Sequence, residues 1–238
     1  QLSKTNGWWN SVAVADFDKD GDLDIVAGNW GLNSRLSASE KQPMKLYAAD
    51  FDDNGTIDPI VTYFDHNTET TIATKDELVK QIPSLNKKFL SYSAFAKAQI
   101  DELFSPKQLK EAATKYVYTL GSTYFENTNN QFTAKLLPFE SQISSTYDIA
   151  VDDFNNDGFS DLFIVGNTYE ISTQLGRLDA SHGLLLLNDK KGYFAVAKQQ
   201  NFDIPGAARS VHKLQQKDSS LFVIGRNNSS PIFLKKED

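Results

Sequence analysis

The 238 residues of the sequence include no cysteine and only three histidines, His66, His182 and His212. The missing cysteines exclude disulfides, thiol catalysis and cysteine-based zinc sites. None of the histidines has the spacing of a metal-binding pair or a catalytic triad, and no Walker, dinucleotide-binding or Gly-x-Ser-x-Gly motif occurs. No apolar run approaches the roughly 20 residues of a membrane-spanning helix. The sequence therefore offers no recognisable catalytic constellation.

Positive charge is also scarce, since 24 Lys and Arg face 31 Asp and Glu, for a net charge of −7. This balance argues against a nucleic-acid partner. Hydrophobic residues make up 40% and charged residues 23%, which is typical of a globular chain. The sequence starts at Gln1 without an initiator Met or a signal peptide, so we expect it to be a processed or excised piece of a longer protein.

Much of the acidity lies in a motif that occurs three times, at 16–24, 50–58 and 153–161. Each copy has oxygen-bearing side chains at relative positions 1, 3, 5 and 9, Phe at position 2 and Gly at position 6. Hard cations such as Ca²⁺ take about 6–8 oxygen ligands, and a curled loop can supply them from alternate residues and from one backbone carbonyl, here at position 7. Gly at position 6 permits the sharp turn.

The motif has two other interpretations. An EF-hand would need a Glu at position 12, which is Ala27, Val61 and Ile164 in the three copies. Ordinary Asp/Gly turns between strands would suit one copy, but three copies in the same register favour calcium loops. The apolar runs on both sides of each copy predict a strand–loop–strand unit.

The three loops resemble the calcium loops of FG-GAP/VCBS repeats, which form the blades of integrin-α-like β-propellers. The segment 7–11 and a long insert after residue 74 are also similar to the C-terminal part of large bacterial VCBS repeat proteins. The Phe-Gly and Gly-Ala-Pro signatures of the family are not intact here. Their nearest counterparts are Gly28, Gly166 and Gly225, each after the second strand of a unit.

The resemblance implies three Ca²⁺ sites. The first would use the side chains of Asp16, Asp18, Asp20 and Asp24 and the carbonyl of Asp22. The second would use Asp50, Asp52, Asn54 and Asp58, with Thr56 at position 7. The third would use Asp153, Asn155, Asp157 and Asp161, with Phe159 at position 7.

The fold is predicted to be all-β. Short strands with frequent turn signals suit a sandwich, a barrel or a propeller, and the internal repeat favours a β-propeller region over residues 1–238. We expect about four blades, which suggests an arc of a larger propeller, because closed propellers have about 4–8. The first unit looks incomplete, because a new loop starts at Asp50 soon after the first one.

Residues 75–116 break the strand pattern and predict a helical insert. Capping boxes begin at Thr74 and Ser105, the second followed by Pro106 at the first helical position. Apolar residues at helical spacing predict faces that need a packing partner; they are Leu78, Val79, Ile82, Phe95, Ile100, Leu103 and Phe104. The insert would be either a stabilising cover on the propeller rim or an element that docks a partner or acts as a lid.

Two further groups of side chains have open roles. Trp8, Trp9 and Trp30 would either stack on sugar rings or pack between blades, and we favour packing. Arg177, Asp179 and His182 form a polar cluster in a loop without a metal motif. They would either line a small pocket at a propeller mouth or brace the loop with a salt bridge, and we favour the brace.

Two functions fit these observations. The first is a non-catalytic, calcium-binding interaction module of a bacterial protein that is extracellular, cell-surface or periplasmic, with a protein or glycan as partner. The rest of a larger propeller, or self-association, would cover its open blade faces. The alternative is part of an extracellular enzyme that acts on glycan or a related polymer. That function would need a polar pocket with acidic residues not committed to metal.

Overall fold

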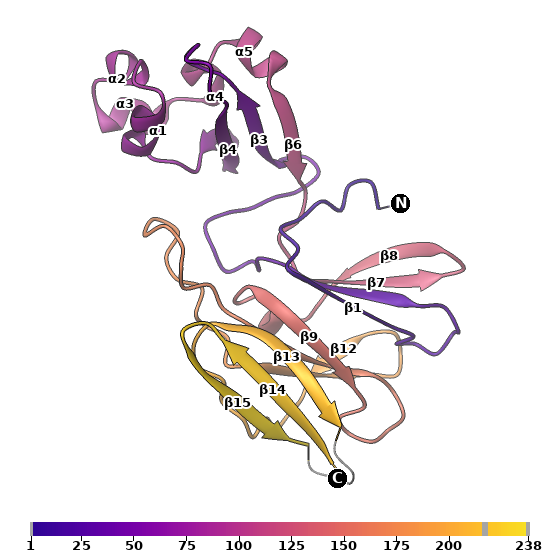
Figure 1. The fold of residues 1–238 in the computed structure, drawn as a ribbon. Coiled ribbons are helices and arrows are strands. Elements are labelled where there is room, and N and C mark those ends of the chain that lie inside the picture. Colours follow the sequence, from indigo (N-terminus) through magenta and orange to yellow (C-terminus); the bar gives the residue numbers. More distant parts are fainter. Residues whose placement is uncertain (1, 216–218, 237–238) are drawn as a thin grey trace. The chain divides into compact units, whose positions relative to one another are not determined.

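The computed structural model describes residues 2–215 and 219–236. It contains four antiparallel sheets and a group of short helices (Figure 1). Over these residues no sheet closes into a barrel, and the prediction of an all-β chain of blade-like sheets with a helical insertion is confirmed. Two compact units divide the chain: Gly7–Arg35 with the residues from Leu120 onward, and Leu36–Thr119, with short N-terminal pieces in each.

Three sheets make up the first unit. The first has the order β1 (Ser11–Ala15), β2 (Asp24–Gly28), β7 (Thr123–Thr128) and β8 (Gln131–Leu136). In the second, β9 (Thr146–Asp152) is followed by β10 (Asp161–Gly166), β11 (Leu184–Asn188) and β12 (Phe194–Val196). The third contains β13 (Ala208–Gln215), β14 (Ser220–Arg226) and β15 (Ser229–Lys235). A short 3₁₀ helix, Phe139–Ser141, precedes β9.

The first sheet is complete, and the expectation of an incomplete first unit was wrong. β2 pairs with β7 through Ile25↔Phe125 and Ala27↔Thr123, and β7 pairs with β8. The second unit is thus inserted between the second and third strands of the first sheet. The order of the sequence hides this pairing. The β7–β8 hairpin follows the second acidic loop in sequence, although it belongs to the sheet of the first.

The first strands of the three sheets lie side by side, with β9 in contact with both β1 and β13. This order is compatible with blade-like sheets arranged in succession. One face of the first sheet packs on the second sheet through a core that includes Ala13, Val26, Tyr124 and Leu162. The other face of the second sheet packs on the third, so every residue of β10 is buried.

The second unit combines one sheet with five helices. The sheet has the order β5 (Thr68–Thr71), β4 (Asp58–Asp65), β3 (Met44–Ala49) and β6 (Ala113–Val117). The helices are α1 (Lys75–Gln81), α2 (Leu85–Lys88), α3 (Tyr92–Lys97), α4 (Ile100–Leu103) and α5 (Pro106–Glu111). Among the described residues, no helix is long and apolar enough to span a membrane.

Both predicted capping boxes are confirmed, at Thr74 with Glu77 and at Ser105 with Gln108. The predicted helical faces pack together with the sheet in one core, which contains Tyr47, Phe51, Ile60, Leu78, Ile82, Phe95, Ile100, Leu103 and Phe104. The helices end at Glu111 rather than at residue 116, because residues 113–117 pair with β3 as strand β6.

Candidate metal centres

The three acidic loops share one backbone conformation. Position 4 and the Gly at position 6 both have a positive φ in every loop; these residues are Lys19 (63°) and Gly21 (95°), Asp53 (59°) and Gly55 (85°), and Asn156 (57°) and Gly158 (88°). Left-handed non-glycine residues are uncommon, and Asp and Asn are enriched among them. Three repetitions of the same unusual curl therefore mark one structural motif rather than three ordinary turns.

The Asp at position 9 closes each loop. Asp24, Asp58 and Asp161 are buried, with exposed fractions of 0%, 2% and 0%. In each loop, one carboxylate oxygen accepts a hydrogen bond from the backbone N–H of the Phe at position 2, at 3.0, 2.9 and 2.8 Å respectively. This bond ties the start of the loop to the start of the following strand.

The other oxygen of position 9 anchors the loop to a neighbouring element. Asp24 Oδ1 accepts from the N–H of Asn127, at 2.7 Å, and Asp161 Oδ1 accepts from the N–H of Asn188, at 2.8 Å. Both asparagines lie in the third strand of their sheet. In the second unit, β5 pairs with β4 only from Thr62 to Asp65 and does not reach Asp58, which accepts instead from Nε2 of Gln81, at 3.0 Å.

The first loop brings carboxylate oxygens of Asp16, Asp18 and Asp24 within 4.8 Å of one another. Asp16 Oδ1 is buried and has no hydrogen-bond partner among the described residues. Burial, together with the nearby carboxylates of Asp24 and Asp20, raises the pKa of Asp18. A bound cation would satisfy the buried oxygen and relieve the repulsion between the carboxylates, so these residues fit a metal ion.

The second loop repeats this arrangement with Asp50, Asp52 and Asp58, again within 4.8 Å. Here the buried oxygen that lacks a hydrogen-bond partner in the described part of the chain is Asp52 Oδ1. Partial desolvation disfavours the charged form of Asp50, but the N–H groups of Gly55 and Asn54 outweigh it and hold its pKa below the usual value. Asp50 therefore stays ionised and available to a cation.

The remaining predicted ligands in these two loops also shape the turn. Asp20 Oδ1 accepts from the N–H of Asp22, at 2.8 Å, and Asn54 Oδ1 accepts from the N–H of Thr56, also at 2.8 Å. The carboxylate of Asp22 accepts from the N–H of Asn129, at 2.7 Å. The side chain of Asp22 is thus used outside the loop, which suits the predicted ligand role of its backbone carbonyl alone.

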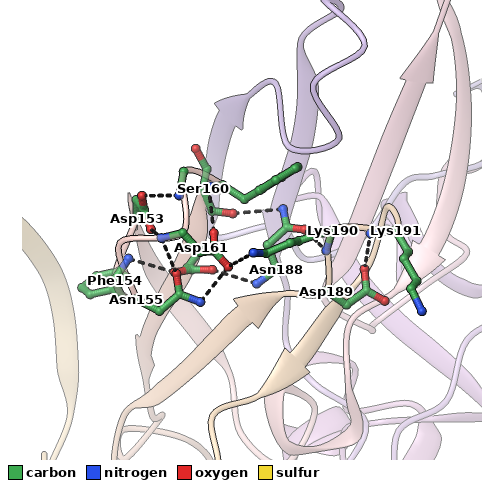
Figure 2. Close-up of polar contacts among 12 residues, drawn as sticks. Asp153, Phe154, Asn155, Ser160, Asp161, Asn188, Asp189, Lys190 and Lys191 are labelled. Carbon is green, nitrogen blue, oxygen red and sulfur yellow. Dashed lines mark hydrogen bonds and ion pairs between the residues drawn. The ribbon is translucent and has the colours of Figure 1, made fainter.

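The third loop has the same curl but a different charge arrangement (Figure 2). Both oxygens of Asp153 accept backbone N–H groups, at 2.9 and 2.7 Å. Asp157 accepts from the N–H of Phe159, at 2.9 Å, and pairs with the ammonium of Lys190, at 3.1 Å. That N–H and the Lys190 ammonium outweigh desolvation and lower the pKa of Asp157. The amide of Asn155 also donates to Asp157, at 2.9 Å, so donors within the loop and Lys190 from the β11–β12 turn together balance its charge.

Asn188 connects the third loop with the first, a role that the sequence analysis missed. Its Nδ2 donates to the carbonyls of Phe17, at 2.8 Å, and Ser160, at 3.2 Å, while its N–H donates to Asp161 (Figure 2). The available signal was positional: in the sequence, Asn188 ends an apolar run just before a turn, and Asn127 begins an Asn-rich turn.

The other predicted clusters serve packing and bracing. Arg177 lies over the ring of Tyr169, 5.2 Å from its centroid, and His182 Nδ1 is 2.6 Å from Asp203 Oδ1. Among the described residues, Arg177 and His182 do not contact each other, and each contacts a residue outside the predicted cluster.

The tryptophans pack against other aromatic rings. Trp8 packs edge-on against Trp30 at 5.3 Å, and Trp9 packs edge-on against Phe125 at 5.9 Å, both between ring centroids.

Comparison with protein families gave one match: the model of the FG-GAP repeat matches residues 8–31. The comparisons with curated proteins and with solved structures gave no match. The matched segment contains β1, the first acidic loop and β2, followed by Gly31. The other two loops repeat its acidic spacing and its positive-φ curl. Residues 8–31 are therefore similar to an FG-GAP repeat, and this similar segment includes the first acidic loop.

Proposed function

We propose that the chain is a calcium-binding β-propeller module that mediates interactions and is not itself catalytic. The observation that carries this proposal is the pair of acidic triads, each with a buried carboxylate oxygen that lacks a hydrogen-bond partner among the described residues. By analogy with FG-GAP/VCBS modules, its setting would be an extracellular, cell-surface or periplasmic bacterial protein.

Calcium is the ion that suits these donors best. The proposed side-chain ligands are carboxylates, with one amide each in the second and third loops, and hard oxygen donors of this kind select Ca²⁺ or Mg²⁺ over metals that prefer nitrogen or sulfur. Mg²⁺ requires a tight octahedral shell, whereas Ca²⁺ accepts the irregular shell that a loop provides. We assign a third ion to the loop at 153–161, with weaker affinity, because Lys190 already neutralises Asp157 there.

Calcium should raise the thermal stability of the chain. Extracellular modules bind Ca²⁺ at about 10⁻⁴–10⁻³ M; with Kd near ~0.1 mM and ~1 mM free Ca²⁺, each independent site contributes about 1.4 kcal/mol. Calorimetry of chelator-treated protein should show saturable calcium binding and a rise in melting temperature that equal Mg²⁺ does not reproduce. Unchanged melting at saturating calcium would contradict the proposal.

The outer faces of the first unit offer surfaces for the proposed interactions. The face of the first sheet that points away from the second exposes Val12 (67%), Val14 (52%) and Leu136 (50%). On the third sheet, Phe233 (59%) and Leu214 (49%) are exposed in the same way. Exposed apolar side chains that share one sheet face are candidates for an interaction surface. We propose that further blades of a larger propeller, or a second copy, cover these faces, and that the assembled module contacts an extracellular protein or glycan.

Self-association through the first sheet is testable by light scattering. The isolated chain should have a mass above that of a monomer, and Val12→Lys with Leu136→Lys should return it to a monomer by placing charge on that face. Leu90→Lys is the matched control, because Leu90 is 86% exposed in the helical part of the second unit. A wild-type chain that stays monomeric at high micromolar concentration would rule out the second copy. A glycan array and a pull-down with the full-length protein would then search for the partner.

A further inference from the structure

An aromatic cavity of about 350 Å³ lies between the second and third sheets of the first unit. Its lining includes four phenylalanine rings: Phe154, Phe163, Phe202 and Phe222. Leu185 and Leu234 complete the apolar wall, while Asn201, Lys235 and Lys236 supply the polar atoms. The volume is within the about 300–1,000 Å³ that is usual for small-molecule sites, and such sites combine apolar walls with a few polar groups.

The cavity has a rigid base and a more open rim. Phe163 and Phe222 are 3% and 2% exposed, and their ring centroids are 6.1 Å apart. Phe154 and Phe202 are only partly buried, although each packs against Phe163. The cavity opens at the surface, so these rings are accessible to a ligand.

Phe154 shows how this cavity differs from the other sheet contacts. The Phe at position 2 of the first two loops is fully packed: Phe17 is 1% exposed against Tyr124 and Phe194, and Phe51 is 5% exposed. Phe154 occupies the same position in the third loop, but part of its ring faces the cavity. The repeat thus places an aromatic side chain here that a ligand can contact.

The ionisable residues in the lining are both basic. Two of the nine lining residues are lysines and none is acidic. The ammonium of Lys236 lies beside the Phe154 ring, 6.0 Å from its centroid, and donates to the carbonyl of Asp153. A ligand with an apolar body and one acidic group would place the body among the rings and the acid near the ammonium groups.

From these contacts we propose that the cavity binds a small amphiphilic anion, an aliphatic or aromatic chain that ends in one carboxylate. The site adjoins the third acidic loop through Phe154, but its lining includes none of that loop's proposed side-chain ligands, and the proposal does not depend on calcium binding. A linear peptide would add amide groups along its length, for which the apolar lining offers few partners.

The probe for the test is decanoate, used below its micelle concentration, with 1-decanol as the uncharged counterpart. Isothermal titration of the intact chain should show one saturable decanoate site. Methyl NMR signals of Leu185 and Leu234 should shift on binding, whereas those of Leu46 and Leu109 in the second unit should not. Decanoate binding that does not saturate, or that shifts all leucines alike, would overturn the proposal.

Two sets of variants separate the charge from the cavity. The double variant Lys235→Gln with Lys236→Gln should weaken decanoate binding by about fivefold to tenfold, which is the effect of losing two exposed ion pairs. Its affinity for decanol should stay within about twofold of the wild-type value. The control pair, Lys110→Gln with Lys198→Gln, makes the same change in net charge at exposed positions outside the lining and should leave both ligands unaffected.

Filling the cavity should abolish binding of both ligands. Leu234→Trp places a larger side chain in the wall, and Asn201→Trp does so from the exposed rim, where folding is less at risk. Each variant is first checked for an unchanged melting temperature. Full decanoate affinity in a folded Leu234→Trp or Asn201→Trp variant would show that the ligand binds elsewhere.

Discussion

Replacing Asp24 with alanine is expected to lower the free energy of unfolding by about 3–5 kcal/mol, even in chelator. The buried carboxylate accepts three hydrogen bonds, from the N–H of Phe17, the N–H of Asn127 and the hydroxyl of Tyr124. Alanine would leave all three donors buried without that partner, which costs about 1–3 kcal/mol for each. In calcium the loss should be larger, because the proposed metal site disappears as well.

Asp22→Ala is the matched control, because it removes the same charge from the same loop. Asp22 gives its side chain to a single bond, with the N–H of Asn129, so we expect a loss below about 1 kcal/mol and little change in calcium affinity. Urea titration followed by tryptophan fluorescence suits both variants, since all three tryptophans lie in the first unit. Equal losses for Asp22→Ala and Asp24→Ala would refute the anchoring role of position 9.

Gly166→Ala should be comparably damaging. A Cβ built on Gly166 would lie 1.7 Å from the carbonyl oxygen of Ser145 and 2.8 Å from its carbonyl carbon. Both contacts are with backbone, which can yield only if β9 and β10 move apart. Overpacking typically costs about 1–3 kcal/mol and occasionally more, and we expect about 3 kcal/mol here. The melting temperature of the first unit would then fall by about 6–12 °C.

Gly225→Ala tests whether the backbone contact is the cause. Gly225 has the corresponding place in the third sheet, but there the Cβ would meet the hydroxyl of Ser210, at 2.6 Å, which can rotate away. We therefore expect a clearly smaller fall in melting temperature, measured by calorimetry. If Gly225→Ala lowers the melting temperature as much as Gly166→Ala, the close approach at Ser145 is not what requires glycine.

Local features were predictable from the sequence because each is determined by a few neighbouring residues. The acidic spacing and Gly21, Gly55 and Gly158 define the curl of the three loops, and Thr74 and Ser105 mark helix starts. Alternating apolar residues around the loops predicted the strands that flank them. In these segments propensity, turn chemistry and hydrophobic pattern agree, which is the condition under which a sequence specifies local structure.

The features that were missed depend on contacts between distant residues. Nothing near β2 indicates that its partner is β7, after the whole second unit. The clamp at position 9 likewise depends on Asn127 and Asn188, whose neighbouring sequence indicates only the boundary between a strand and a turn. The aromatic cavity forms only where two sheets meet. Side-chain periodicity identifies which face of a strand is apolar, but not which sheet will cover it.

The insertion of one unit between β2 and β7 also affects the order in which the chain can fold while it is being synthesised. Asp24 and Tyr124, which bond in the finished sheet, are 100 residues apart in sequence. At about 5–20 residues per second, the β1–β2 ribbon waits about 5–20 s on the ribosome before β7 emerges. Meanwhile the contiguous strands and helices of the second unit are complete and can fold by themselves. The nascent chain thus carries an unpaired strand edge for seconds, and this interval is when a chaperone or a neighbouring chain has most opportunity to bind it.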